Sequence, residues 1–302
     1  YETSQQNRQW IDFFHNNFDH YRDVENIADV AVLHSYSTMA YNNDRPYQST
    51  FLFEQALIQA KIPFDIIFDR HLDDLSRYKV LVLADQEALS PDKLSAIREF
   101  VRQGGGLVAT EHTSLYHEPR ERKREFGLQE LLQVEPPDWP GRGAPEPVLN
   151  LSPVRNETGD GRVVYISEVR PEEPKPPAAA MRGEYWKLPS NWWELTEAVR
   201  WAANEELAVE INAPLTVTME LNAQTTTGNR MLHLVNFDSE NQQIVKNIDV
   251  KLQLDNDTQV EEVSVLSPEY PTQKLHFRVE GDQVQFTVPK LDTYDLVIIQ
   301  TE

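Results

Sequence analysis

The spacing of apolar residues changes twice along the chain, and each change marks a different kind of structure. Over the first 26 residues, aromatic side chains recur every three or four positions, at Trp10, Phe13, Phe14, Phe18 and Tyr21. This spacing predicts a lead-in helix with one aromatic face, over residues 1–27. That face either packs on the chain's own domain or docks against a preceding domain.

From residue 28 to about 210, short continuous apolar runs alternate with stretches of helical periodicity. Such runs are typical of strands that are buried on both faces of a sheet. The repeated strand–helix order predicts an α/β domain with a doubly wound, mostly parallel sheet. We expect strands at 30–33, 64–68, 79–84, 107–110 and 161–166, and helices at 48–61, 91–103 and 191–204.

Three consecutive glycines, Gly104, Gly105 and Gly106, invite comparison with a phosphate-binding loop. Phosphate loops follow a strand and open a helix, whereas these glycines follow a predicted helix and precede a predicted strand. They therefore indicate the left-handed C-terminal cap of a helix. At the other end of that helix, Ser90 and Pro91 form a favourable start.

Beyond Pro214 the period of the apolar residues becomes two, which is typical of strands with one buried face. Residues 280–282 (Glu-Gly-Asp) indicate a tight hairpin turn, and Tyr294 suggests a tyrosine corner. The pattern predicts an antiparallel β-sandwich over residues 211–302. Its expected strands lie at 215–221, 231–237, 248–254, 260–266, 275–279, 284–288 and 294–299.

Composition and charge narrow the classes of partner. The 302 residues have globular composition, with 40% hydrophobic and 25% charged residues, and no apolar stretch is long enough to predict a membrane span. The formal net charge of −21 disfavours a nucleic acid partner, and it is easier to reconcile with a neutral ligand such as a sugar. The chain has no cysteine, so disulfides, thiolate metal sites and cysteine nucleophiles are excluded.

Several segments together resemble two known families. The α/β segments resemble the trimerisation domain of family 42 β-galactosidases, which is related to the class I glutamine amidotransferase fold. The later segments extend the resemblance, over nearly the whole chain, to glycoside-hydrolase-like proteins that carry a (β/α)₈ barrel ahead of two such modules. The matching segments are 34–37, 79–85, 89–91, 100–110, 110–116, 126–128, 232–237 and 288–295.

This resemblance implies that the chain is the back part of a larger glycoside hydrolase, because fewer than 30 residues precede the first α/β strand and a barrel needs at least about 200. It implies a non-catalytic accessory region that shares a carbohydrate substrate with the barrel and forms a homo-oligomer, most plausibly a trimer. We expect no cofactor. The cysteine nucleophile of the amidotransferases does not carry over, since the equivalent neighbourhood reads Glu111, His112 and Thr113.

Ligands of open α/β sheets bind outside the carboxyl ends of the strands. On this sheet that edge would carry the catalytic candidates Asp85, Glu111 and His112, since a carboxylate beside an imidazole can perform acid–base chemistry. The simpler interpretation is that these polar groups cap helices and loops. Residues that could contact a ligand at the same edge are His34, Ser35, Tyr36, Gln86, Ser114 and Tyr116, with Asp69 beside them.

Other site chemistries find less support. A triad of Ser35, His112 and Asp85 lacks the G-x-S-x-G elbow. A metal site from His112, His117 and Glu118 lacks a recognised ligand spacing, so we predict no metal. The alternative to an accessory region is a stand-alone hydrolase of amidotransferase-like fold that uses Glu111 and His112.

Overall fold

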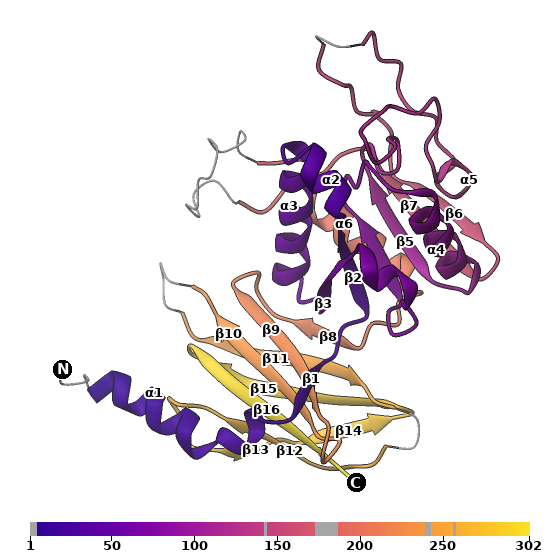
Figure 1. Ribbon diagram of the computed structural model, residues 1–302. Helices are drawn as coiled ribbons and strands as arrows, with labels where there is room; N and C mark the ends of the chain where they lie inside the picture. Colours follow the sequence, from indigo (N-terminus) through magenta and orange to yellow (C-terminus); the bar gives the residue numbers. More distant parts are fainter. Residues whose placement is uncertain (1–4, 142–143, 173–186, 239–242, 256–257) are drawn as a thin grey trace. The chain divides into compact units, whose positions relative to one another are not determined.

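The computed structural model describes residues 5–141, 144–172, 187–238, 243–255 and 258–302. The chain forms two compact units (Figure 1). One contains Asp29–Leu57 and Phe64–Glu206, and the other contains Tyr1–Ala28, Ile58–Pro63 and Leu207–Glu302. We call them the α/β unit and the sandwich unit.

The α/β unit is built on a six-stranded sheet with the order β3-β2-β4-β5-β7-β6. All neighbouring strands are parallel except the pair β6 and β7. The mostly parallel sheet that the sequence predicts is therefore confirmed. Its strands are β2 (Val30–His34), β3 (Phe64–Phe68), β4 (Val80–Leu83), β5 (Gly106–Thr110), β6 (Val154–Thr158) and β7 (Gly161–Ile166).

Helices cover this sheet, with α4 and α5 on the side opposite α3 and α6 (Figure 1). The central strands β2, β4 and β5 are fully buried because both of their faces are covered. Strand β3 is the edge strand next to β2, and it is buried only at Ile67. The helices are α2 (Tyr36–Tyr41), α3 (Arg45–Gln59), α4 (Pro91–Arg102), α5 (Gln129–Leu132) and α6 (Trp192–Ala202), with the 3₁₀ turn η2 (Asp69–Asp73).

The triple glycine ends α4, as predicted. Gly104 has a φ of +100°, its N–H donates to Val101 O, and the N–H of Gly105 donates to Phe100 O, both at 3.0 Å. This pattern is a Schellman motif. Gly105 also touches its helix closely, since a Cβ there would lie 2.5 Å from the Phe100 ring. The glycines are therefore structural.

The sandwich unit contains two antiparallel sheets that share one core of buried apolar residues. The larger has the order β1-β9-β10-β16-β12-β13, and the smaller has the order β14-β15-β11-β8. A β-sandwich is therefore present. Its strands are β1 (Val24–Asn26), β8 (Val209–Asn212), β9 (Val217–Gln224), β10 (Arg230–Asn236), β11 (Val245–Gln253), β12 (Val260–Leu266), β13 (Gln273–Lys274), β14 (Phe277–Glu280), β15 (Gln283–Leu291) and β16 (Tyr294–Thr301).

The lead-in helix is shorter than its aromatic spacing predicts. It ends at Asn16 as α1 (Gln5–Asn16), and η1 (Phe18–Tyr21) and β1 follow it. β1 pairs with β9, and Trp10, Phe13 and Tyr21 pack on buried residues of the larger sheet. The aromatic face therefore packs within its own unit, although Ile11, Phe14 and Phe18 stay exposed.

Two further details differ from the sequence prediction. The hydroxyl of Tyr294 bonds the side chains of Tyr21 and His233, so Tyr294 does not form a tyrosine corner. Short elements such as α2, β6 and β8 were not predicted. No helix in the described ranges is long and apolar enough to span a membrane.

Candidate functional site

The polar residues predicted at the strand ends are brought together, but nearly all of them are buried. His34, Ser35, Asp85, Gln86, Glu111, His112, Ser114 and Tyr116 are each at most 7% exposed. Tyr36 is the exception, with 76% of its surface exposed. The edge of the sheet is therefore a closed polar cluster with one tyrosine outside it.

Asp85 lies at the centre of this cluster, in the turn after β4. Its Oδ1 accepts a hydrogen bond from the backbone N–H of His112 at 2.9 Å, and its Oδ2 accepts one from Arg45 Nε at 3.2 Å. Arg45 also contacts Nδ1 of the His112 ring, whose Nε2 donates to Pro147 O at 2.8 Å. Arg45, the first residue of α3, therefore ties two strand ends together.

The hydrogen bonds of the His112 ring indicate a structural role. Burial lowers the pKa of His112, whereas Asp85 and Glu146 raise it, and the overall shift is upward. A proton on Nδ1 would nevertheless face the Arg45 guanidinium, so we assign the neutral ring with its proton on Nε2. Since both ring nitrogens are occupied, the imidazole has no free nitrogen to serve as a general base.

Glu111 follows β5 directly and adopts a φ of +45°, in the left-handed region that only a few per cent of non-glycine residues occupy. Its Oε1 accepts hydrogen bonds from Ser49 Oγ at 2.9 Å and from Val169 N–H at 2.8 Å, while its buried Oε2 has no hydrogen-bond partner among the residues that the structure describes. Burial and the negative charge of Asp85 raise the pKa of Glu111 to about 8. At neutral pH this carboxyl group is therefore mostly protonated.

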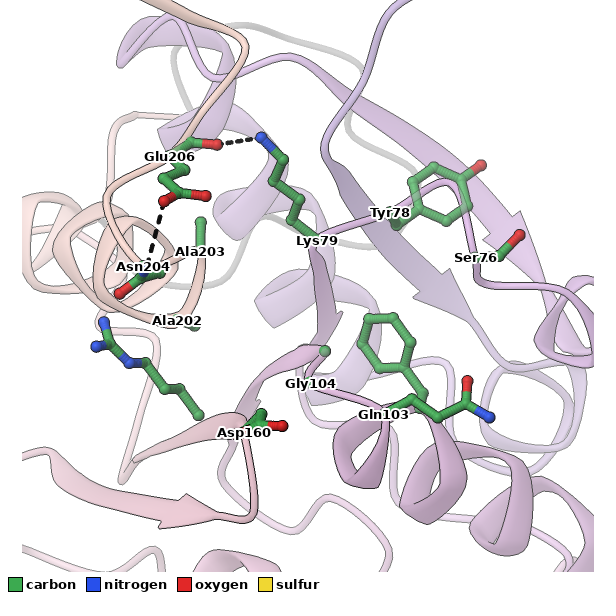
Figure 2. A pocket seen from close by; sticks show the side chains of 13 residues that line it. Ser76, Tyr78, Lys79, Gln103, Gly104, Asp160, Ala202, Ala203, Asn204 and Glu206 are labelled. Atoms are coloured by element: carbon green, nitrogen blue, oxygen red, sulfur yellow. Dashed lines mark hydrogen bonds between the residues drawn. The ribbon is translucent and has the colours of Figure 1, made fainter. Parts of the chain in front are cut away.

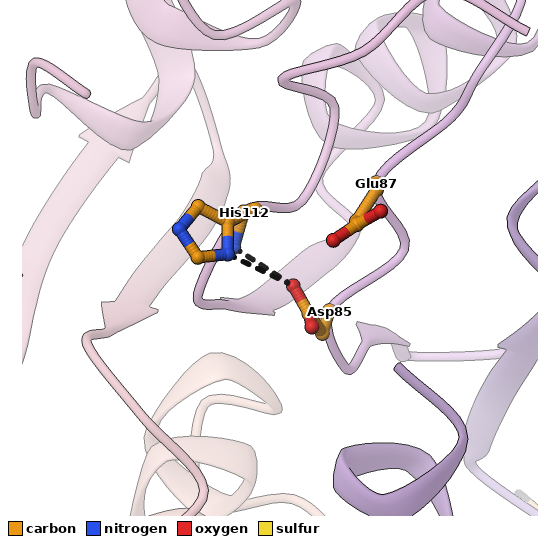
Figure 3. A group of neighbouring side chains, drawn as sticks. All are labelled: Asp85, Glu87 and His112. Atoms are coloured by element: carbon orange, nitrogen blue, oxygen red, sulfur yellow. Dashed lines mark hydrogen bonds and ion pairs between the residues drawn. The ribbon is translucent and has the colours of Figure 1, made fainter. Parts of the chain in front are cut away.

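Glu87, Asp85 and His112 form a group whose ligand atoms lie within 4.8 Å of one another (Figure 3). Among the described residues it is the only such group of histidines and carboxylates. Glu87 already accepts hydrogen bonds from Asn42 Nδ2 at 2.9 Å and from Arg120 Nε at 3.2 Å. Because Arg45 and Arg120 supply the positive charge here, we assign no metal to this group.

The remaining candidates have partners of their own. His34 Nε2 lies 2.5 Å from Glu54 Oε1, and the Gln86 side chain accepts the N–H of Ser35 at 2.8 Å. Ser114 Oγ accepts the N–H of Leu128 at 3.1 Å, and the Tyr116 hydroxyl donates to Glu146. These contacts tie loops to the sheet.

The two other proposed constellations do not form. Ser35 Oγ donates to Ala88 O at 3.3 Å, and no hydrogen bond joins Ser35 to His112 in the described part of the chain. Glu118 is paired with Lys93 at 2.7 Å and belongs to no metal-ligating group within those ranges. The sequence therefore placed several residues correctly at one edge, but it did not reveal that they are sealed.

Some partners in the cluster were missed from the sequence. Arg45 and Ser49 are four residues apart on α3, a spacing that puts both on one helical face, towards Asp85 and Glu111. That spacing could have been read as a signal once a helix start at Arg45 was known. Glu146 and Pro147 come from a proline-rich loop whose course the sequence does not predict.

An open cavity of 580 Å³ lies at the opposite, amino end of the strands (Figure 2). It is lined by Tyr78, Lys79, Gly104, Asp160 and Glu206 among others. Lys79 Nζ donates to Glu206 O, and Asn204 Nδ2 donates to the Glu206 carboxylate at 3.4 Å. The cavity is therefore walled by polar groups that bond one another, and ligands of such sheets bind at the other edge.

Solved structures of similar fold come from glycosidases. An α-L-fucosidase isoenzyme from Paenibacillus thiaminolyticus matches 96% of this chain with a TM-score of 0.64 and 19% identity. β-Galactosidases from Bacillus circulans sp. alkalophilus and Rahnella sp. R3 match 93% and 92% of it, with TM-scores of 0.58 and 0.56 and identities of 16% and 14%. The chain spans 51%, 42% and 41% of these proteins, respectively.

These identities are low enough that the structures establish similarity of fold alone. No curated protein sequence matches the chain. Residues 28–122, which include β2 to β5 with α2, α3 and α4, match the family described as the β-galactosidase trimerisation domain. Over these residues the chain is thus similar to a β-galactosidase trimerisation domain, which confirms the resemblance predicted from its sequence motifs.

Proposed function

We propose that this chain is a non-catalytic accessory and oligomerisation region of a larger glycoside hydrolase. The observation that carries this proposal is the match of residues 28–122 to the β-galactosidase trimerisation domain. The parent protein would then assemble as a homo-oligomer, a trimer by that description. A (β/α)₈ barrel elsewhere in the parent would carry the carboxylate pair that hydrolyses its carbohydrate substrate.

We also assign the α/β unit to the doubly wound, flavodoxin- and amidotransferase-like arrangement. The strand order β3-β2-β4-β5-β7 supports this assignment, because it corresponds to the order 2-1-3-4-5 of flavodoxin-like sheets. Strand β6 extends the sheet as an antiparallel edge strand. The assignment concerns architecture and transfers no chemistry.

The burial of the strand-end cluster supports a structural role for its residues. Asp85, Glu111 and His112 are each at most 1% exposed, so they offer almost no surface to a substrate. We therefore propose that they hold the ends of β4 and β5 in place. A stand-alone hydrolase that uses Glu111 and His112 finds no support in this geometry.

The contact with a second copy would use the surface that we call the β3 edge patch, made of Tyr36, Tyr41, Ile66 and Phe68. These four side chains are 76%, 56%, 48% and 47% exposed, and all lie within residues 28–122. The N–H of Tyr36 donates at 3.0 Å to the carboxylate of Asp69, the residue after Phe68, which joins the start of α2 to the end of β3. Strand β3 also has no partner on one side among the described strands, and an unpaired strand edge favours association.

The charge balance explains why such a local patch is needed. A net charge of −21 repels copies of the chain from one another in general. At the patch itself, Lys93 pairs with Asp69 at 3.0 Å and with Glu118 at 2.7 Å, so part of the local negative charge is offset. Apolar contact can then outweigh the repulsion locally.

Sedimentation of the full-length parent protein, at physiological and at high salt, tests the proposal. We expect a trimer, and we expect Phe68→Lys to release monomers while Trp193→Lys, at a side chain 57% exposed elsewhere on the unit, does not. A monomeric wild type under both conditions would refute the oligomerisation role. A trimer that withstands both Phe68→Lys and Ile66→Lys would refute the patch alone.

The catalytic part of the proposal has its own test. Purified residues 1–302 should not hydrolyse aryl glycosides. Hydrolysis that is abolished by Glu111→Gln would overturn the accessory role, because it would place chemistry in the strand-end cluster.

A further inference from the structure

Asp295, in the second position of β16, carries a carboxylate that points into the sandwich unit. It lies on the same face of the strand as Val297 and Ile299, which belong to the buried core. Asp295 is 1% exposed, and neither carboxylate oxygen has a hydrogen-bond partner among the described residues. A buried carboxylate without partners is costly, so this position calls for a compensating group.

Other oxygen atoms with unused capacity lie beside it. The groups that influence the Asp295 carboxylate are Ser267, Glu269, Lys290 and Asp292. Glu269 Oε1 is buried and also has no partner, while its Oε2 accepts a hydrogen bond from Ser267 Oγ at 3.0 Å. Ser267 Oγ in turn lies 3.3 Å from the backbone oxygen of Tyr294. Two carboxylates, a hydroxyl and a carbonyl therefore meet at one end of the sandwich.

The neighbouring lysine does not neutralise these carboxylates directly. Lys290 Nζ lies over the Tyr270 ring, 3.0 Å from its centroid, and its positive charge lowers the pKa of Asp295. The Tyr270 hydroxyl donates to Asp292 Oδ2 at 3.3 Å. Burial nevertheless raises the pKa of Asp295 to about 7, so the attraction of Lys290 does not fully offset the cost of a charge at this position.

We propose that Ser267, Glu269 and Asp295 bind a divalent cation, Ca²⁺, at this end of the sandwich. The available ligands are all oxygen atoms, which suit a hard cation, and neither histidine nor cysteine is among them. Ca²⁺ accepts carboxylate, hydroxyl and backbone carbonyl oxygens in flexible geometry, whereas Mg²⁺ demands a near-ideal octahedron. The inference does not depend on the oligomerisation role, since all of these residues lie in the sandwich unit.

The test is a calorimetric titration of the chelator-treated full chain with CaCl₂, together with its thermal unfolding with and without Ca²⁺. We expect the wild type to bind Ca²⁺ and to unfold at a higher temperature in its presence. Asp295→Asn should weaken binding by roughly tenfold or more. Asp249→Asn is the matched control, because Asp249 is an exposed acid of the same unit that accepts a hydrogen bond from Thr287.

Glu269→Gln provides a second variant if Asp295→Asn does not fold, since Glu269 lies in a loop at the edge of the core. It too should weaken binding while Asp249→Asn leaves binding unchanged. The proposal is overturned if the wild type shows no binding at millimolar Ca²⁺, or if the folded site variants bind as the wild type does. Equal stabilisation of all variants by CaCl₂ would show general screening of the acidic surface, and would likewise overturn it.

Discussion

Arg45 Nε donates to Asp85 Oδ2 at 3.2 Å, which joins the first residue of α3 to the turn after β4. The Asp85 side chain is fully buried, whereas 31% of the Arg45 side chain is exposed. The Arg45 guanidinium therefore covers the buried Asp85 carboxylate. Burial lowers the pKa of Arg45, but the negative charge of Asp85 opposes this and the pKa is raised overall, so the guanidinium stays charged.

Removing the Arg45 guanidinium should destabilise the α/β unit. In Arg45→Met the buried Asp85 carboxylate keeps the backbone N–H of His112 but loses its cation. We expect the free energy of unfolding to fall by about 3 kcal/mol, measured by urea denaturation. The double variant Arg45→Met, Asp85→Asn should lose less than the sum of the single losses, because no charge is left buried. Additive losses would contradict the coupling.

Glu111 should give the protein an unusual dependence of stability on pH. Its pKa in the folded chain is about 8, above the ordinary value of 4.5, so the folded state holds a proton that the unfolded state releases. Stability from this group is therefore complete below pH 4.5 and is lost as the pH rises to about 8.

The variant Glu111→Gln tests that dependence. It should abolish a slope of up to about 1.4 kcal/mol per pH unit in the wild type within this window. Urea unfolding at a series of pH values should show wild type and variant closest in acid, and the variant relatively more stable in mild alkali. Parallel curves would mean that Glu111 is ionised in the folded chain.

The hydrogen bonds of Tyr294 should stabilise the packing of the N-terminal segment on the rest of the sandwich unit. The Tyr294 hydroxyl bonds Tyr21 Oη at 3.0 Å and His233 Nδ1 at 2.7 Å. Tyr294→Phe leaves both groups without this partner and should cost about 1–2 kcal/mol in the free energy of unfolding. Tyr36→Phe, at an exposed tyrosine, is the control and should be neutral within a few tenths of a kcal/mol. An equal loss in both variants would contradict the role of this hydrogen bond.

Alanine substitutions at the two glycines after α4, Gly104 and Gly105, should distinguish the cost of backbone strain from the cost of steric contact. A Cβ at Gly104 would lie 3.6 Å from its nearest neighbour, so Gly104→Ala meets only the strain of a φ of +100° and should cost about 1 kcal/mol. A Cβ at Gly105 would lie 2.5 Å from the Phe100 ring, so Gly105→Ala should cost more. Thermal unfolding of both variants measures the difference, and the reverse order would contradict it.

The elements that were predicted well are those whose evidence is local. Strands β3 and β12 have the bounds that their apolar patterns indicate, and the glycine cap of α4 follows from backbone sterics alone. Elements of a few residues, such as β8 and α2, were missed because they contain too few positions to show a period. The lead-in helix was predicted too long because aromatic spacing does not distinguish a helix from a helix followed by a short turn and a strand.

The amino-acid pattern by itself determined the two kinds of sheet, their order along the chain and the gathering of Asp85, Glu111 and His112 at one edge. These follow from periodicity and from the parallel connection of the strands, which are properties of neighbouring residues. Only the tertiary structure decided that the polar groups at this edge are buried and hydrogen-bonded, because their partners Arg45, Glu146 and Pro147 are distant in sequence. It also decided that Asp295 is buried with no hydrogen-bond partner in the described part of the chain, because burial depends on the packing of two sheets.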